Sequence, residues 1–140
     1  MKKNKIPILV TGCAGFIGFH VCKKLLNSDL KIVGIDNIND YYDINLKKDR
    51  LSNLKKFKKF KFLKIDITKK KKLDKLFFQN KFKIVIHLAA QAGVRLSHDK
   101  PGIYVQNNIL GFYNIIDAAK NNLTKHFIYA SSSSVYGNSK

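Results

Sequence analysis

Three glycines near the start of the chain, Gly12, Gly15 and Gly18, are spaced three residues apart. They follow a short apolar run, residues 6–10, which is typical of a strand buried on both faces. After the glycines, apolar residues recur with helical spacing to about Leu26. The chain is therefore expected to pass from a buried strand through a tight turn directly into a helix.

Each of these glycines has a separate expected task. Gly12 permits the tight turn, Gly15 lets a phosphate approach the backbone, and Gly18 lets the helix pack on the strand. Main-chain N–H groups around position 15 can then face a diphosphate, because no side chain covers them. The motif predicts a dinucleotide-binding turn.

The rest of the chain continues the alternation of strand and helix. Strands separated by helices of this length imply right-handed crossovers, so we expect an α/β fold: a Rossmann-type doubly wound parallel sheet, incomplete at the C-terminus. Residues 1–140 are expected to be the N-terminal portion of one dinucleotide-binding domain. Further strands are predicted at 31–35, 60–65, 84–88 and 127–130, and helices at 46–57, around 73–78 and from Pro101 to Lys120.

One local conflict concerns the helix around 73–78. Lys69 to Lys72 would occupy its first turn, where the helix dipole disfavours cations. We therefore expect the start of this helix to be frayed or displaced.

Asp36 lies 18 residues beyond Gly18, at the predicted end of the second strand. A carboxylate there can accept hydrogen bonds from the hydroxyls of an adenosine ribose, which favours NAD. A 2′-phosphate would be repelled, and the neighbouring Asn37 offers no guanidinium to bind it.

Charge is the most unusual feature of the composition, with 27 Lys and Arg against 9 Asp and Glu and a net charge of +18. A lysine-rich solvated surface is the favoured interpretation, and a polyanion-binding module is the alternative. Nucleic acid is not the expected partner, since specific readers rely on Arg and stacked aromatics.

The cysteines and histidines set limits on other classes of protein. Two cysteines are too few for a disulfide framework, and the apolar run before Cys13 is too short for an export signal, so a cytoplasmic protein is expected. No stretch is long enough to span a membrane. Histidine spacing predicts no metal site.

The chain resembles the extended short-chain dehydrogenases, and among them the NAD-dependent nucleotide-sugar epimerases and dehydratases. The string 11–18 matches their TGxxGFIG pattern, which adds Phe16 and Ile17 to the expected cofactor-binding residues. Asp66 and Ile67 match an acidic-aliphatic pair, implying contact with adenine, although Lys69 replaces a common second acid. Residues 87–90 match the segment that passes the nicotinamide-side ribose, and residues 108–111 match a helix with a supporting asparagine. The cofactor-binding set is completed by Asp36, Asn37, Leu88, Ala89, Ala90, Gln91 and Asn108.

Two further strings, 36–42 and 89–95, look like the UDP-glucuronate 4-epimerase branch of that family. The resemblance implies a UDP-sugar substrate, with Arg95 facing an anionic group of the substrate or the cofactor phosphates; a solvated loop arginine is the alternative. The string 131–137 looks like the family's serine motif. This match implies that the hydroxyl of Ser132 partners a catalytic tyrosine and that Ser133 and Ser134 contact the sugar.

The resemblance also implies a reaction by transient oxidation at sugar C4, with a tyrosinate as base and NAD as hydride acceptor and donor. The family's Tyr-x-x-x-Lys pair has no match: Tyr136 and Lys140 have that spacing, but the serine motif already accounts for Tyr136. We therefore expect residues 1–140 alone to bind NAD weakly or not at all, and to be inactive. Full-length relatives are expected to be homodimeric. Alternatives are a dehydratase or decarboxylase of the same family and a non-catalytic NAD-binding module.

Overall fold

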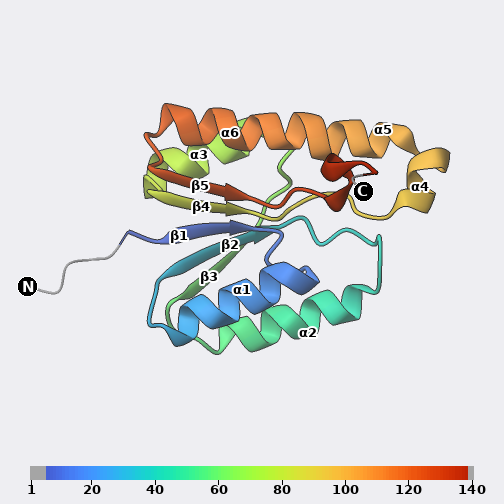
Figure 1. Ribbon diagram of the computed structural model, residues 1–140. Helices are drawn as coiled ribbons and strands as arrows, with labels where there is room; N and C mark the ends of the chain where they lie inside the picture. Colours follow the sequence, from blue (N-terminus) through green and yellow to red (C-terminus); the bar gives the residue numbers. More distant parts are fainter. Residues whose placement is uncertain (1–5, 139–140) are drawn as a thin grey trace, which may run out of the picture.

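The computed structural model describes residues 6–138. Five strands form one sheet in which every pairing is parallel, in the order β3-β2-β1-β4-β5 (Figure 1). This order confirms the predicted doubly wound α/β class, because the chain winds outward from β1 first on one side and then on the other. The strands are β1 (Ile8–Thr11), β2 (Ile32–Asp36), β3 (Phe60–Lys64), β4 (Ile84–His87) and β5 (His126–Tyr129).

Helices cover both faces of the sheet (Figure 1). On one face lie α1 (Phe16–Asn27) and α2 (Ile44–Lys55), and on the other α3 (Lys70–Asn80) and α6 (Phe112–Asn121). Such three-layer packing lets a parallel sheet bury both faces. Shorter elements complete the chain: α4 (Val94–Asp99), α5 (Pro101–Tyr104), the π-helix η1 (Val105–Gly111) and the 3₁₀-helix η2 (Ser133–Tyr136).

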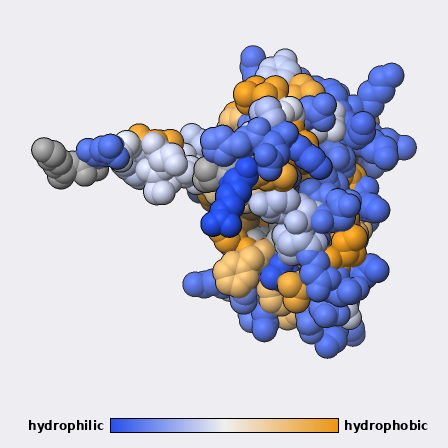
Figure 2. All heavy atoms as spheres, turned by 90° about the vertical axis from the view of Figure 1, so that its right-hand side faces the viewer, coloured by the Kyte–Doolittle hydropathy of each residue, from blue (hydrophilic) through white to orange (hydrophobic). Residues whose placement is uncertain are grey.

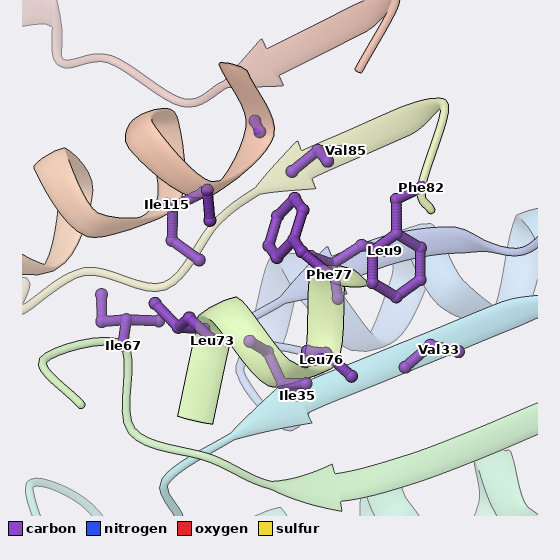
Figure 3. Packing of buried hydrophobic residues seen from close by; sticks show 12 residues of the cluster. Leu9, Val33, Ile35, Ile67, Leu73, Leu76, Phe77, Phe82, Val85 and Ile115 are labelled. Atoms are coloured by element: carbon purple, nitrogen blue, oxygen red, sulfur yellow. The ribbon is translucent and has the colours of Figure 1, made fainter. Parts of the chain in front are cut away.

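Two apolar clusters stabilise the layers. Figure 3 shows the first, in which Leu76 and Phe77 of α3 and Ile115 of α6 pack against Leu9 and Val33 of the sheet. The second cluster lies under α1 and α2 and includes Cys22, Leu26, Leu51 and Leu54. The strands contribute side chains to both clusters, because successive residues of a strand point to opposite faces of the sheet.

The start of α3 differs from the sequence-based expectation. The helix begins directly at Lys70, with Lys69 as its N-cap, so the lysines neither fray nor displace it. Lys70 forms ion pairs with Asp74 on its own helix and Asp117 on α6. These carboxylates offset the unfavourable interaction between a cation and the helix dipole.

The long helix expected from Pro101 to Lys120 is present as one helical path, but it is not uniform. It runs through α5, η1 and α6, and the middle segment has the wider π spacing. Such bulges are rare and occur frequently at functional sites. The short helix α4, which precedes this path, was not predicted.

The strand predicted at 127–130 is β5, which lies at the edge of the sheet. Its last residue, Tyr129, is 55% exposed. Within residues 6–138, no helix is long and apolar enough to cross a membrane.

Candidate cofactor-binding site

A cavity of about 560 Å³ opens at the carboxyl ends of β1, β2 and β4. In a doubly wound sheet, ligands bind at this edge, where the strand order reverses beside the first strand. The cavity has the size of a small-molecule site. Figure 2 views the molecule from the side of these strand ends, where hydrophilic residues surround scattered hydrophobic patches.

The glycine-rich turn forms one wall of the cavity. Gly12 has a φ of +68°, a left-handed conformation that favours glycine, and a side chain there would lie 2.9 Å from the backbone nitrogen of Ala89. At Gly18, a Cβ would lie only 2.0 Å from the carbonyl oxygen of Gly12. Glycine at these two positions therefore lets the turn, α1 and the segment after β4 come together.

The start of α1 presents main-chain donors to the cavity. Phe16 and Ile17 are its first two residues and line the cavity; Gly15 is the N-cap and has no side chain to cap them. The first N–H groups of an α-helix have no partner within the helix. Together with the helix dipole, they make this end suited to an anion such as a diphosphate.

Asp36 links the glycine-rich turn to the end of β2. One carboxylate oxygen accepts the N–H of Ala14 at 3.1 Å, and the other accepts the N–H of Ile38 at 2.8 Å. The side chain is 8% exposed and lines the cavity. Each oxygen keeps a second lone pair, so the carboxylate can still accept from the hydroxyls of a ligand.

A buried hydrogen-bond network joins β1 to β4 beneath the cavity. The hydroxyl oxygen of Thr11 accepts the N–H groups of Leu88 at 3.1 Å and Ala89 at 3.0 Å. Its own proton is then left for Nδ1 of His87, which lies 2.8 Å away. Burial lowers the pKa of His87 to about 4, so the ring is neutral and its proton sits on Nε2. This network fixes the segment after β4 against the turn.

Asn108, on η1, supports the same segment from the other side. Its carbonyl oxygen accepts the N–H of Gln91 at 2.8 Å, and its amide donates to the carbonyl of Gln91 at 2.9 Å. The paired bonds hold the main chain of Gln91 in one orientation. Gln91 lines the cavity, whereas Asn108 does not.

The ends of β2 and β3 are joined by polar side chains. Asn37 donates to Asp66 at 3.2 Å, and Asp66 also accepts from the N–H and the hydroxyl of Thr68. Burial alone would raise the pKa of Asp66, but these hydrogen bonds and the charge of Lys69 outweigh it and lower that pKa. Asp66 therefore remains ionised and anchors the neighbouring Ile67, which lines the cavity.

The structure brings most of the predicted cofactor-binding residues to one cavity. Asp66 and Asn108 stand behind its wall, in contact with residues that line it. The predicted residues that line it are Gly12, Gly15, Phe16, Ile17, Gly18, Asp36, Asn37, Ile67, Leu88, Ala89, Ala90 and Gln91.

The residues expected to serve catalysis and substrate binding lie outside this cavity. Arg95 is exposed on α4, and the serines follow β5 at the sheet edge. Ser132 caps η2 and accepts the N–H of Ser134 at 3.2 Å. Tyr136 is exposed on η2, and Lys140 lies outside the described residues.

Sequence reasoning missed a second wall of the cavity, formed by α2 and the loop before it. Lys47 and Arg50 line the cavity with Tyr41 and Tyr42. Arg50 donates to the carbonyl of Ala14 at 3.2 Å and to the hydroxyl of Tyr42 at 3.0 Å. Asn37 offers no guanidinium, but Arg50 brings one to Ala14, the residue whose N–H donates to Asp36.

One signal could have identified this wall. Lys47 stands at helical spacing with Leu51 and Leu54, on the buried face of α2, and is itself only 4% exposed. A lysine in a buried position of an amphipathic helix needs polar partners. Here they are the main-chain and side-chain oxygens of Asn39.

The described residues contain no cluster of three or more potential metal ligands. Both cysteines are buried free thiols. Burial raises the pKa of Cys13, and it raises the pKa of Cys22 to about 12. Thiols in this state are poor nucleophiles and poor metal ligands.

A family model described as GDP-mannose 4,6 dehydratase matches residues 9–140. Among curated relatives, Protein CapI of Staphylococcus aureus is 46% identical over 132 residues, which are 94% of this chain and 39% of the relative. A UDP-glucuronate 4-epimerase of Thermodesulfobacterium geofontis is 47% identical over 128 residues, covering 91% of this chain and 40% of the relative.

Solved structures give the same pattern. The UDP-glucuronic acid 4-epimerase of Bacillus cereus in complex with UDP-glucuronic acid and NAD aligns with a TM-score of 0.84 and 40% identity. That alignment covers 96% of this chain and 42% of the other. The chain thus spans about two fifths of the length of the proteins it matches.

Proposed function

Because the chain belongs to the GDP-mannose 4,6 dehydratase family, we propose that residues 1–140 form the N-terminal portion of the NAD-binding domain of a nucleotide-sugar epimerase, with UDP-glucuronate as its substrate. The observation that carries the proposal is the cavity itself. It combines an uncapped helix start, a carboxylate at the end of β2 and a glycine-rich turn too crowded for side chains. A family relative with NAD in its solved structure shares the fold over 96% of this chain.

The residues of the cavity divide into groups that suit the parts of the cofactor. The main-chain N–H groups of Phe16 and Ile17 would bind the diphosphate, and Asp36 would accept from the adenosine ribose hydroxyls. Ile67 would contact adenine. The segment 88–91, held by Thr11 and Asn108, would carry the nicotinamide-side ribose.

Bound NAD supplies a hydride acceptor and donor, which transient oxidation at sugar C4 requires. The contribution of this chain is orientation, because its fixed main-chain donors need no rearrangement when the anion arrives. Ser132 would place its hydroxyl beside a catalytic tyrosine, and Ser133, Ser134 and Arg95 would contact the substrate. Residues 1–140 offer no Tyr-x-x-x-Lys pair besides Tyr136 and Lys140, so we expect no epimerisation by this chain alone.

The proposal can be tested in a chimaera. Residues 1–140 replace the matching region of the Thermodesulfobacterium geofontis epimerase, and conversion of UDP-glucuronate to its C4 epimer is measured. We expect epimerisation by the chimaera and none by the chimaera carrying Gly18→Ala. A folded chimaera with no activity, while the parent enzyme is active, would refute the proposal.

Two observations each favour a different alternative function. The description of the matching family model favours a dehydratase that uses the same cofactor-binding half. The net charge of +18 favours a polyanion-binding module. In the second case DNA retention would fall steeply with salt and would persist when Gly12 and Gly15 are replaced.

A homodimer is part of the proposal for the whole protein. On the helical path from α5 to α6, the side chains of Val105, Ile109, Tyr113 and Ile116 are exposed at helical spacing. An exposed apolar stripe of this kind is typical of a helix that packs against a partner.

A further inference from the structure

We propose that the edge of the sheet opposite the cavity binds the surface of an anionic lipid bilayer. This edge, hereafter the amino edge, consists of the loops that enter β2, β3, β4 and β5, and it lies at the left of Figure 1. The loops are residues 28–31, 56–59, 81–83 and 122–125. Because the cavity opens at the other ends of the strands, the inference is independent of the proposed function.

Lysine is present in every loop of the amino edge. The structure describes these four loops in full, and their only acidic residue is Asp29, which forms an ion pair with Lys59. The exposed lysines of the loops are Lys31, Lys56, Lys58, Lys59, Lys81 and Lys125. At the opposite edge, the carboxylates of Asp36, Asp40 and Asp66 offset nearby cations. The positive charge of the amino edge is therefore largely uncompensated.

Two large apolar side chains lie exposed among these lysines. Phe78, in the last turn of α3, is 73% exposed, and Leu123, in the loop after α6, is 76% exposed. Phe78 lines the same open depression as Asn122, the neighbour of Leu123. The two loops are also joined, because Nζ of Lys83 donates to the carbonyl of Leu123 at 3.4 Å. Phe78 and Leu123 thus belong to one corner of the amino edge.

The backbone at Leu123 is in a conformation that a bulky residue rarely adopts. Its φ is +54°, in the left-handed region, where glycine or asparagine is usual at the end of a helix. The N–H of Leu123 donates to the carbonyl of Lys120 at 3.1 Å, and the N–H of Thr124 donates to that of Ala119 at 3.0 Å, which is the Schellman pattern. The chain therefore holds an apolar side chain in water at a position better suited to glycine. This arrangement becomes favourable when the side chain enters an apolar phase.

A bilayer suits this combination better than a nucleic acid or a peptide does. The interface of a membrane accepts apolar side chains between its charged head groups, whereas the phosphates of DNA offer them no apolar phase. The four loops contain lysine but no arginine, and lysine binds anions as a point charge without the fixed geometry of a guanidinium. A peptide would need a groove for its own apolar side chains, but Phe78 and Leu123 are themselves the exposed groups.

The test is co-sedimentation of the 140-residue chain with lipid vesicles in about 0.1 M salt. One set of vesicles is phosphatidylcholine alone, and the other also contains phosphatidylglycerol. We expect binding to the anionic vesicles only, and we expect it to weaken as salt is added. Binding to neither set, or equal binding to both, would overturn the inference.

Leu123→Asn tests the apolar contact. Because asparagine tolerates the left-handed conformation, the variant should unfold at the same or a higher temperature, yet bind anionic vesicles about tenfold more weakly. The matched control is Val135→Asn, which removes an exposed apolar side chain beyond the other end of β5 and should leave binding unchanged. If Leu123→Asn binds as the wild type does, the inference is wrong.

A double variant, Lys81→Gln with Lys125→Gln, tests the charge. Each lysine near an anionic surface contributes about fivefold, so this variant should bind about 10- to 30-fold more weakly. Lys48→Gln with Lys100→Gln removes the same charge from α2 and from the junction of α4 and α5, and should weaken binding much less. Thermal unfolding establishes that each variant is folded. Equal losses in the two double variants would overturn the inference, because binding would then reflect net charge alone.

Competition with duplex DNA separates a bilayer surface from a general polyanion site. We expect an excess of DNA phosphate over lipid phosphate to leave most of the chain on the anionic vesicles, because DNA offers nothing to Phe78 and Leu123. Complete displacement by DNA, together with DNA binding that Leu123→Asn does not weaken, would show that the amino edge binds nucleic acid and not a membrane.

Discussion

Because the folded chain excludes a proton from His87, its stability should begin to fall near pH 6.5, above the pH at which most carboxylates titrate. Its Nδ1 accepts the hydroxyl proton of Thr11, so a second ring proton would have to displace that hydrogen bond. The ring also packs beside Phe112 and Phe127, with ring centres 5.4 and 6.4 Å away, where a charge has no partner. Burial accordingly lowers the pKa of His87 from 6.5 to about 4.

The sign and size of the effect follow from this pKa. Between pH 6.5 and about 4 the unfolded chain binds a proton that the folded chain does not, so stability falls as pH falls through this window. A difference of about 2.5 in pKa corresponds to a total loss of about 3 kcal/mol in the free energy of unfolding. About 2 kcal/mol of this loss appears between pH 7 and about pH 4.5.

Urea denaturation at these two pH values measures the loss in free energy of unfolding. His87→Asn should be less stable than the wild type at pH 7, although it keeps an acceptor for the Thr11 hydroxyl. Because Asn cannot titrate, the variant should lose about 2 kcal/mol less free energy of unfolding than the wild type on acidification. His98→Gln, which removes an exposed histidine, should behave as the wild type does. Equal acid losses in the wild type and His87→Asn would refute the reasoning.

Three further predictions concern the turn, its support and the thiols. Gly18→Ala would place a Cβ 2.0 Å from the carbonyl oxygen of Gly12 and should lower the free energy of unfolding in urea by about 3 kcal/mol or more. In the control Gly102→Ala, the added Cβ meets nothing within 4 Å, so this variant should be neutral or more stable by about 0.5–1 kcal/mol. Asn108→Ala removes both hydrogen bonds to Gln91 and should cost about 1–3 kcal/mol; a loss no larger than that of the exposed Asn53→Ala would contradict this. Cys13 and Cys22 should resist alkylation at neutral pH until the chain unfolds, as followed by mass spectrometry; rapid labelling of the native chain would show that they are not buried.

Features that depend on a few neighbouring residues could be predicted from the sequence. The strand, glycine turn and helix around Gly12 follow from local spacing, and the alternation of elements fixed the class of the sheet. The position of Asp36 at the end of β2 required only that the second strand be recognised. For such residues, the neighbouring sequence is enough to predict the local structure.

Other features depend on contacts between distant segments. The lysines at the start of α3 predicted a frayed or displaced helix. The carboxylate of Asp117 comes close to Lys70 only once α6 has packed beside α3, so the local sequence does not reveal this ion pair. Arg50 joins the cavity because α2 lies against the turn, which brings it to the carbonyl of Ala14. The edge position of β5 likewise follows from the strand order rather than from its own sequence.

The measurement that tests the central claim most directly is an amide-shift NMR titration of residues 1–140 with NAD. We predict weak, saturable shifts at the amides of the turn from Gly12 to Gly18 and around Asp36, because these groups would contact the diphosphate and the adjoining ribose. Asp36→Ala should weaken the response to NAD. If NAD shifts only residues elsewhere, or if the folded chimaera with the Thermodesulfobacterium geofontis epimerase binds no NAD, the claim that this cavity binds the cofactor is wrong.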